Sequence, residues 1–155
     1  MNRFHKLLRF QFKLHSGGGK IRNKLSHYLN CLIGFYYHCD IPNSIDPTGV
    51  FFCHNGFNIV INPNTKIGYN TYIQHGVTIG VRDDLKSCDA PIIGNGVYIG
   101  AKATIIGDIH IGDNCKIGAG ALVISDIPEG CTAVGVPAKI ITKNKHDIKW
   151  IESFS

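Results

Sequence analysis

Aliphatic residues return at every sixth position through the middle of the chain. The series breaks once, after its fourth member, and then resumes with the same period. The ten positions are Ile61, Ile67, Ile73, Ile79, Ile93, Ile99, Ile105, Ile111, Ile117 and Val123. A period of six matches neither an amphipathic helix nor the two-residue alternation of a long strand. A short strand followed by a tight turn explains it.

Each six-residue unit is expected to form one side of a triangular coil. The aliphatic residue points to the coil axis, and the small residue two positions earlier, such as Ala103 or Cys115, fills the corner. Glycine follows the aliphatic residue in six units, where a tight turn excludes a larger side chain. Three units complete a coil of about eighteen residues, and stacked coils pair as parallel sheets. The sequence therefore predicts an all-β fold, a parallel β-helix.

The first 39 residues show a different pattern. Apolar residues at helical spacing predict one short helix before a glycine-rich break at 16–19 and a second helix after it. These residues are Phe4, Leu7, Leu8 and Leu14, then Ile21, Leu25, Tyr28, Leu29 and Leu32. We therefore expect an N-terminal helical cap at 1–39, a β-helix domain at 40–141 and a C-terminal tail at 142–155.

The six-residue frame is lost in two places. The first lies between Cys53 and Asn58, and the second is a longer polar insertion at 81–91, which we expect to be an extruded loop. A repeat that stacks well departs from its frame where a turn is extended or a site is built. Both interruptions are therefore expected to border the active site.

Positive charge is concentrated near the N-terminus. Seven Lys and Arg residues precede the first acid, Asp40, in a chain of net charge +5. Such a segment could contact nucleic acid or an anionic membrane surface, or form a solvated helix face. No zinc-finger spacing and no basic stripe with interleaved aromatic residues is present, so a nucleic-acid partner is not expected. A weak membrane-surface contact remains open.

Cysteine usage and hydropathy indicate a cytoplasmic protein. The six cysteines include no CxxC pair, and Arg9 and Lys13 interrupt the apolar stretch near the N-terminus. We therefore expect free thiols in a reducing compartment, with neither a signal peptide nor a membrane span.

Three segments carry a family resemblance: HNGFNIVIN at 54–62, IGYNTYIQHGVTIG at 67–80, and the repeats from Ala90 to Ile141. Over about residues 38–141 the chain resembles the hexapeptide-repeat acyltransferases, in their serine acetyltransferase branch. Within that branch it is most similar to the colanic-acid type of exopolysaccharide O-acetyltransferase. The resemblance implies a left-handed β-helix and acetyl-CoA as the acyl donor. The flat outer faces of such coils favour a homotrimer with the site between neighbours.

Transfer of an acyl group to an alcohol needs a general base, because a free hydroxyl is a poor nucleophile near neutral pH. The resemblance places this base at His54, in the first frame break. It also implies an upstream carboxylate that orients the base, and Asp40 is the match. Asp46 is the alternative, and a turn-forming role for Asp40 stays open.

The acceptor site is less defined by the sequence. His75 and Asn58 are expected to contact the acceptor. In serine acetyltransferases a histidine and an arginine near the end of the loop help to hold the amino acid, whereas this chain has Asp89-Ala90-Pro91 there. The departure removes the expected carboxylate clamp and favours a sugar hydroxyl over serine.

Five residues match positions that contact the cofactor in the resembling family. Gly80, Ala101 and Ala119 would present backbone groups to the pantetheine arm, and Lys116 and Lys139 would face the phosphates. Solvated surface is the alternative for both lysines. No His, Cys and Asp set has metal-ligand spacing, so no catalytic metal is expected.

The first interpretation is thus an acetyl-CoA-dependent O-acetyltransferase acting on a hydroxyl of a polysaccharide or precursor sugar. Serine O-acetyltransferase is an alternative with the same base. A non-catalytic β-helix that serves as a scaffold or binding module is a second alternative. The carbonic-anhydrase-like members of the fold need three zinc-binding histidines, which the sequence does not provide.

Overall fold

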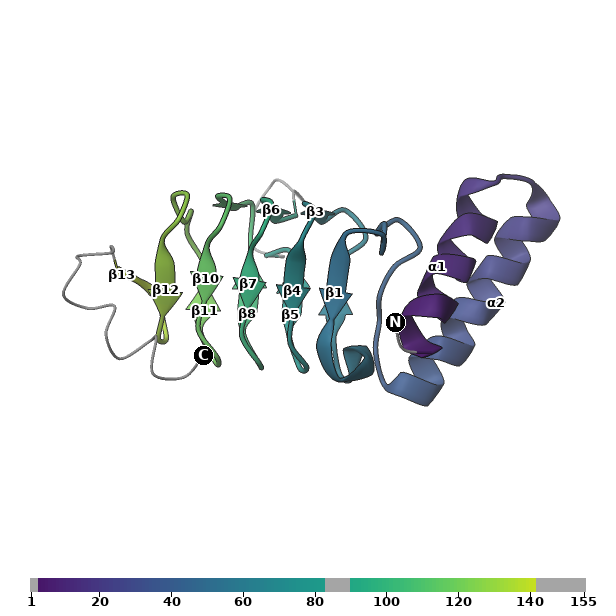
Figure 1. Cartoon of the computed structure of the whole chain (residues 1–155), viewed down its shortest axis with the longest axis horizontal. Coiled ribbons are helices and arrows are strands. Elements are labelled where there is room, and N and C mark those ends of the chain that lie inside the picture. The colour runs from purple at the N-terminus through teal and green to yellow at the C-terminus, as the bar shows by residue number, and fades with distance from the viewer. Residues whose placement is uncertain (1–2, 83–89, 142–155) are drawn as a thin grey trace.

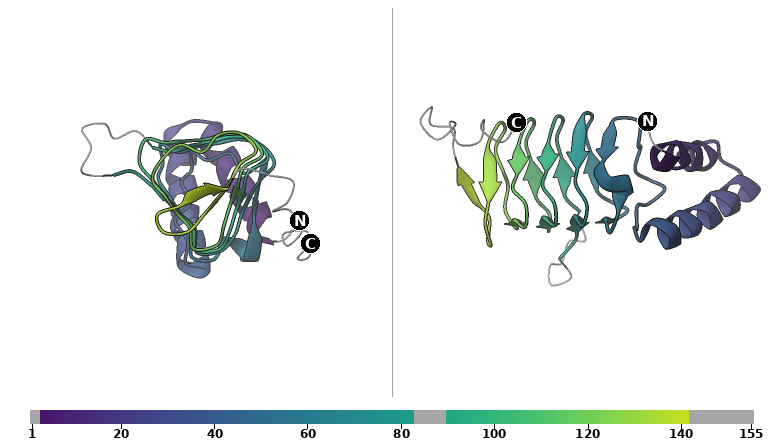
Figure 2. Two further views of the ribbon diagram at one scale, coloured as in Figure 1. Left: turned by 90° about the vertical axis from the view of Figure 1, so that its left-hand side faces the viewer. Right: turned by 60° about the horizontal axis from the view of Figure 1, so that its bottom comes forward.

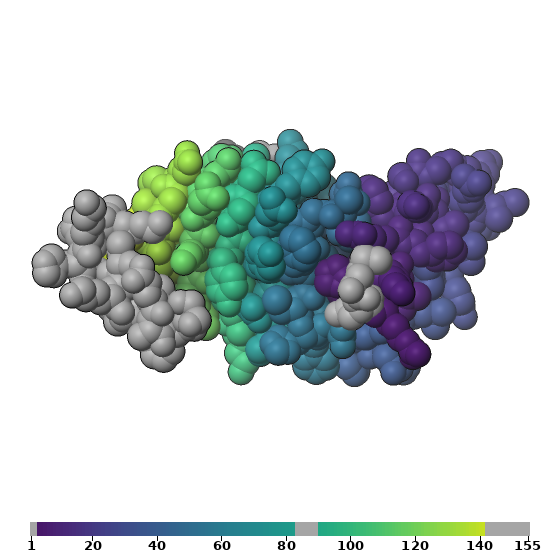
Figure 3. All heavy atoms as spheres, in the orientation of Figure 1, coloured from purple at the N-terminus to yellow at the C-terminus, as the bar shows by residue number. Residues whose placement is uncertain are grey.

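The computed structural model describes residues 3–82 and 90–141. A pair of helices lies at one end of an elongated stack of coiled strands (Figures 1 and 3). The helices are α1 (Arg3–Ser16) and α2 (Lys20–Tyr37), and a 3-10 helix, η1 (Cys53–Gly56), follows the first strand. The strands are β1 (Val50–Phe52), β2 (Val60–Ile61), β3 (Lys66–Ile67), β4 (Thr71–Ile73), β5 (Thr78–Gly80), β6 (Ile92–Ile93), β7 (Tyr98–Ile99), β8 (Thr104–Ile106), β9 (His110–Ile111), β10 (Lys116–Ile117), β11 (Leu122–Val123), β12 (Thr132–Val134) and β13 (Lys139–Ile141).

The strands form three sheets that run along the stack. Their orders are β1-β4-β7-β10-β12-β13, β11-β8-β5-β2 and β3-β6-β9. Paired strands are parallel except β12 and β13, which are antiparallel. Consecutive strands belong to different sheets, so the chain winds around one axis, and its coils lie over one another when viewed along that axis (Figure 2, left). The expected parallel β-helix is confirmed.

The core is the column of aliphatic residues that the six-residue period predicts. Nine of the ten positions are at most 2% exposed, and Ile67 is only partly buried. Burying one such side chain stabilises the fold by about 1.5–3 kcal/mol. The smaller residues two positions earlier, such as Ala103 and Cys115, are also fully buried. The period of six therefore arises because each side of a coil contributes one inward side chain.

One edge of the β-helix, here called the first corner, contains the turns at 53–59, 74–77, 100–103 and 118–121. It joins the β1-β4-β7-β10 sheet to the β2-β5-β8-β11 sheet. Backbone hydrogen bonds tie its coils together: Gly76 donates to Phe57 (3.0 Å), Lys102 to His75 (3.0 Å) and Gly120 to Ala101 (2.9 Å). The successive turns are therefore stacked in register.

The helical pair covers the β1 end of the stack. Phe4 of α1 is fully buried and makes edge contacts with Tyr37 and Phe52, at ring-centroid distances of 4.8 and 6.1 Å. The Ser26 hydroxyl of α2 donates to the Gln11 carbonyl of α1 at 3.2 Å, which joins the two helices. The break between them falls where Gly18 and Gly19 have φ angles of 66° and 92°. Glycine allows such angles because it has no β-carbon.

The helices depart from the sequence analysis in two respects. Because they are 14 and 18 residues long, the description as an all-β fold with a short cap was too narrow. Moreover, Ile21 and Tyr28, two of the apolar residues that indicated the second helix, are 85% and 63% exposed, whereas Ser26 and Ile33 of α2 are buried. The helical period was therefore visible in the sequence, but the buried face was not.

Two expected segments lie partly or wholly outside the described residues. Of the loop expected at 81–91 the structure describes 81–82 and 90–91, and the tail expected at 142–155 falls outside it. In the part of the chain that the structure describes, neither helix is long and apolar enough to cross a membrane.

Candidate active site

His54 lies on the first corner, in the turn that replaces the first frame break. It belongs to η1, and His54, Asn55 and Gly56 all have positive φ angles of 50°, 57° and 65°. The imidazole is exposed. Left-handed backbone is unfavourable for residues with a β-carbon, so the surrounding structure must hold this turn. The Phe4 ring lies where a β-carbon of residue 56 would be, which fixes the turn from the α1 side.

His75 lies one coil further along the same corner. Its ring contacts the His54 ring edge to face, with centroids 5.0 Å apart and planes at 87°. The Nδ1 atom of His75 is buried and has no hydrogen-bond partner among the described residues. An unpartnered buried nitrogen is costly unless a ligand or water completes it. The structure therefore brings together the two histidines that the sequence analysis selected.

Asn58 completes the same turn. It has a φ of 54° and is exposed, three residues before the buried Ile61. Asparagine tolerates left-handed backbone better than most residues. His54, His75 and Asn58, the residues expected for the base and the acceptor contacts, are thus neighbours along one corner.

Asp40 lies beside this corner but is not hydrogen-bonded to His54 in the described structure. Its backbone pairs with Val60 as a parallel bridge, donating to Ile59 at 2.8 Å and accepting from Ile61 at 2.9 Å. The exposed Asp40 carboxylate has no hydrogen bond or ion pair with His54 among the described residues. The alternative, Asp46, accepts from the Thr48 N–H at 2.8 Å, as in a common turn.

Cys53 and Gln74 border the two histidines in the sequence and contact each other. The Gln74 amide donates to the Cys53 sulfur at 3.3 Å and to the Tyr98 hydroxyl at 3.2 Å. Burial raises the pKa of the Cys53 thiol. A protonated thiol is a weak nucleophile, so Cys53 is not a candidate nucleophile.

The five expected cofactor residues are distributed over two edges and one end of the β-helix. Ala101 and Ala119 lie on the first corner, whereas Gly80 ends β5 at the opposite edge of that sheet, with open space around its α-carbon. Lys116 lies on β10, in register with Tyr98 of β7, and is exposed. Lys139 lies on β13, at the end of the stack away from the helices. The structure therefore groups the two alanines with the histidines and leaves the other three apart.

Lys102 is a polar residue of the first corner that the sequence analysis missed. It has a φ of 59° and follows Ala101 directly. A signal was present in the repeats themselves: IGAKA at 99–103 has lysine where IGAGA at 117–121 has Gly120.

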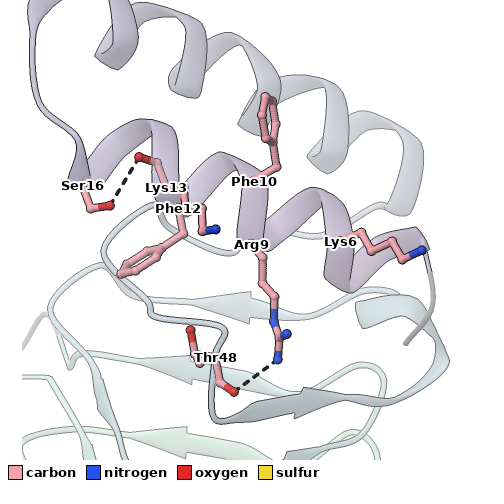
Figure 4. Close-up of a pocket in the computed structure, with 7 residues that line it drawn as sticks. All are labelled: Lys6, Arg9, Phe10, Phe12, Lys13, Ser16 and Thr48. Carbon is pink, nitrogen blue, oxygen red and sulfur yellow. Dashed lines mark hydrogen bonds between the residues drawn. The ribbon is translucent and has the colours of Figure 1, made fainter.

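A groove of about 520 Å³ lies elsewhere, between α1 and the loop around Thr48 (Figure 4). Arg9 reaches across it to the Thr48 carbonyl at 3.4 Å. None of the candidate site residues lines it. Across the described residues, no group of three or more His, Cys, Asp or Glu side chains is placed to hold a metal ion.

Comparison with known proteins gives consistent matches. The family "Bacterial transferase hexapeptide (six repeats)" matches residues 90–125. A serine acetyltransferase of Helicobacter pylori is 42% identical over 125 residues, which cover 81% of this chain and 71% of that protein.

Solved structures agree with the sequence matches. Soybean serine acetyltransferase complexed with serine has a TM-score of 0.74 at 34% identity and covers 87% of this chain. A serine acetyltransferase complexed with CoA has a TM-score of 0.71 at 32% identity and covers 87%. The chain spans only 54% of each of these two structures. Both matches support the left-handed form of the β-helix.

These matches correct the acceptor. The closeness to exopolysaccharide O-acetyltransferases is not supported, and the sugar acceptor was wrong, because the relatives and the solved structures are serine acetyltransferases. The prediction of a sugar acceptor assumed that only residues 89–91 could hold a carboxylate. Asp89 lies outside the described residues, and the first corner carries a separate cation, Lys102.

Proposed function

This chain belongs to the serine acetyltransferase family, and we propose on that basis that it transfers the acetyl group of acetyl-CoA to the hydroxyl of serine. The chain is an acyltransferase, as its family is. The observation that carries the proposal is the exposed His54 imidazole, held on an extended turn of the first corner with His75 against it.

His54 acts as the general base in the proposed reaction. It takes the proton of the serine hydroxyl while the oxygen attacks the thioester carbonyl carbon. The tetrahedral intermediate then collapses, the carbon–sulfur bond breaks, and the CoA sulfur receives the proton from the His54 imidazolium. The products are O-acetylserine and CoA, and no other reactant is needed.

Asp40, Asn58 and His75 assist this step in the proposal. The Asp40 carboxylate stabilises the imidazolium after a side-chain movement, since no hydrogen bond joins Asp40 and His54 in the described structure, where the Asp40 backbone bridges to Val60. Asn58 and His75 contact the acceptor, because both lie on the first corner beside His54. A base that is oriented by a carboxylate loses less activity to wrong tautomers and ring rotations.

Acetyl-CoA lies along the first corner in this proposal. Backbone groups at Ala101 and Ala119 contact the amides of the pantetheine arm, which suits an extended ligand beside small residues. Lys116 and Lys139 interact with the phosphates, whereas Gly80, at the opposite edge of the sheet, is not part of this arrangement.

A homotrimer would complete the site. In the described part of the single chain His54, Asn58 and Ala119 are exposed, and none of them lines the groove beside α1. The outer face of the adjoining sheet carries exposed Phe51 and Tyr72, whose rings stack at 4.7 Å. A neighbouring copy on this face would cover the aromatic rings and exclude water from the first corner.

The experiment is a direct assay. The purified chain is incubated with acetyl-CoA, with and without serine, and both free thiol and O-acetylserine are measured. We expect thiol release that depends on serine and equals the ester formed. Release that is independent of serine, or no release at all, would contradict the proposed function.

A further inference from the structure

Lys102 occupies a position where the stacked repeats otherwise use glycine or asparagine. Four residues of the first corner lie above one another with φ angles of 54° (Asn58), 70° (Gly76), 59° (Lys102) and 67° (Gly120). A β-carbon in left-handed backbone approaches the following carbonyl too closely, so glycine or asparagine is preferred there. Lysine has neither advantage. Unfavourable backbone of this kind is concentrated at functional sites.

The lysine stem lies over Gly76, on the coil that bears His75. Its Cγ is 3.2 Å from where a β-carbon of Gly76 would be, so the stem crosses Gly76 directly. Gly76 is the chain neighbour of His75, and the Lys102 N–H donates to the His75 carbonyl at 3.0 Å. Because Gly76 has no side chain, Lys102 can follow the corner back to the coil that bears His75.

The cation has no counter-charge among the described residues. Lys102 is exposed and makes no ion pair or side-chain hydrogen bond with them. The turns at 53–59, 74–77 and 100–103 contain no Asp or Glu. The buried Nδ1 of His75 also lacks a partner in the described structure. The Lys102 stem and His75 therefore lie on adjacent coils of the first corner, in turns that contain no acid themselves, and the exposed Asp40 beside the corner forms no ion pair with Lys102 in the described structure.

We propose that Lys102 and His75 form the subsite that binds the carboxylate of the acceptor. This inference rests on the proposed function, because serine carries a carboxylate two carbon atoms from its reactive oxygen. A lysine binds such a group as a point charge, and an imidazole N–H donates a hydrogen bond to it. With the carboxylate held by Lys102 and His75, the hydroxyl is left to the neighbouring His54, at 5.0 Å between the imidazole centroids.

This subsite would take over the role of the histidine and arginine that the loop end lacks. Asp89-Ala90-Pro91 offers no cation, and Lys102 supplies one from another element. Lys102 comes from a coil of the rigid β-helix, which positions it independently of the loop.

The test measures Michaelis constants for both substrates in Lys102→Gly and Lys102→Arg. Glycine suits the backbone and removes the charge, whereas arginine keeps it. For Lys102→Gly we expect the KM for serine to rise about tenfold with kcat within about twofold, the pattern of a lost contact made equally before and during reaction. The KM of Lys102→Arg for serine should stay within about threefold of the parent value. Asn114→Gly is the matched control, because Asn114 also has a positive φ (57°) but lies over Gly96 on another edge.

Two further arms identify the source of the anion. With serinamide, which has the hydroxyl but no carboxylate, parent and Lys102→Gly should have the same KM. With acetyl-CoA as the varied substrate, the KM should also be unchanged. A rise in the KM for acetyl-CoA, or a rise in the KM for serinamide as large as that for serine, would overturn the proposal, because Lys102 would then serve the donor or the fold.

A binding measurement separates this proposal from the proposed function. Sodium acetate is titrated against the parent and Lys102→Gly while the His75 ring signals are followed by NMR. We expect saturable shifts in the parent that are lost in the variant. If acetate binds in this way but serine is not acetylated, the proposed function fails and the subsite stands. Equal shifts in both proteins, or none in either, would overturn the subsite.

Discussion

The Phe4 ring of α1 packs on Gly56, the residue that ends the turn bearing His54. The contact joins residues 52 positions apart and places a helix directly behind the candidate base. A β-carbon at residue 56 would overlap the ring, so the turn and the helical pair fit only with glycine there. The helices therefore belong to the active site as its support.

Gly56→Ala should destabilise the protein and impair transfer together. A β-carbon at a φ of 65° and a clash with a fully buried ring should lower the free energy of unfolding by about 2–4 kcal/mol. Gly130→Ala is the matched control, because Gly130 also has a positive φ (68°) but nothing within 4 Å of the added carbon. Urea denaturation followed by circular dichroism compares them. Equal losses would mean that the Phe4 contact is unimportant.

His54→Ala should abolish transfer and leave the fold intact. Loss of a general base lowers the rate by about two to four powers of ten. The imidazole is exposed, so its removal leaves no cavity. His110→Ala, an exposed histidine on β9 in another sheet, is the control and should keep turnover within about twofold. Near-parental turnover by His54→Ala would show that another group is the base.

Replacing Lys116 and Lys139 together by alanine should weaken acetyl-CoA binding. Each exposed cation contributes modestly, so we expect about a fivefold higher KM for acetyl-CoA with little change in kcat. Added salt should produce the same effect in the parent by screening. A short acetyl thioester without the nucleotide is the control donor. If the KM of the double variant rises equally for both donors, the lysines stabilise the structure and do not bind the phosphates.

Ile105→Ala should show how much the inward column stabilises the β-helix. Ile105 is 0% exposed, and truncation of such a residue costs about 2–5 kcal/mol. Ile124→Ala is the control, because Ile124 is 44% exposed and its loss should change the free energy of unfolding by less than about 0.5 kcal/mol. Similar losses for both would contradict the assignment of the core.

The fold was predictable because its signal is local and repeated. Every coil repeats the same pattern of inward residues, so the burial of Ile99, Ile105 and Ile111 could be predicted without knowing their neighbours in space. The interruption at 81–91 could also be predicted. It explains why Tyr98 pairs with Tyr72, 26 positions earlier, whereas it pairs with Lys116 only 18 positions later.

The site was predictable only in part. His54 and His75 could be selected because each stands in a recognisable motif, yet their edge contact depends on how two coils stack. The Phe4 contact behind Gly56 joins a helix to a distant turn, and no period in the sequence links them. Lys102 was not selected, because its position over Gly76 depends on how two coils stack. The acceptor was wrong because a single short segment, 89–91, was taken to define the whole subsite.

The last strand of the first sheet reverses direction. Thr132 pairs with Ile141 and Val134 with Lys139, antiparallel, after a long series of parallel pairs. A parallel ladder whose final strand is left open would be a template for the next chain, as in a growing fibre. Here that template is absent from one end of the longest sheet, and the helical pair covers β1 at the other end. A further copy that paired with β13 would therefore meet a reversed strand, so it could not continue the parallel ladder of this sheet.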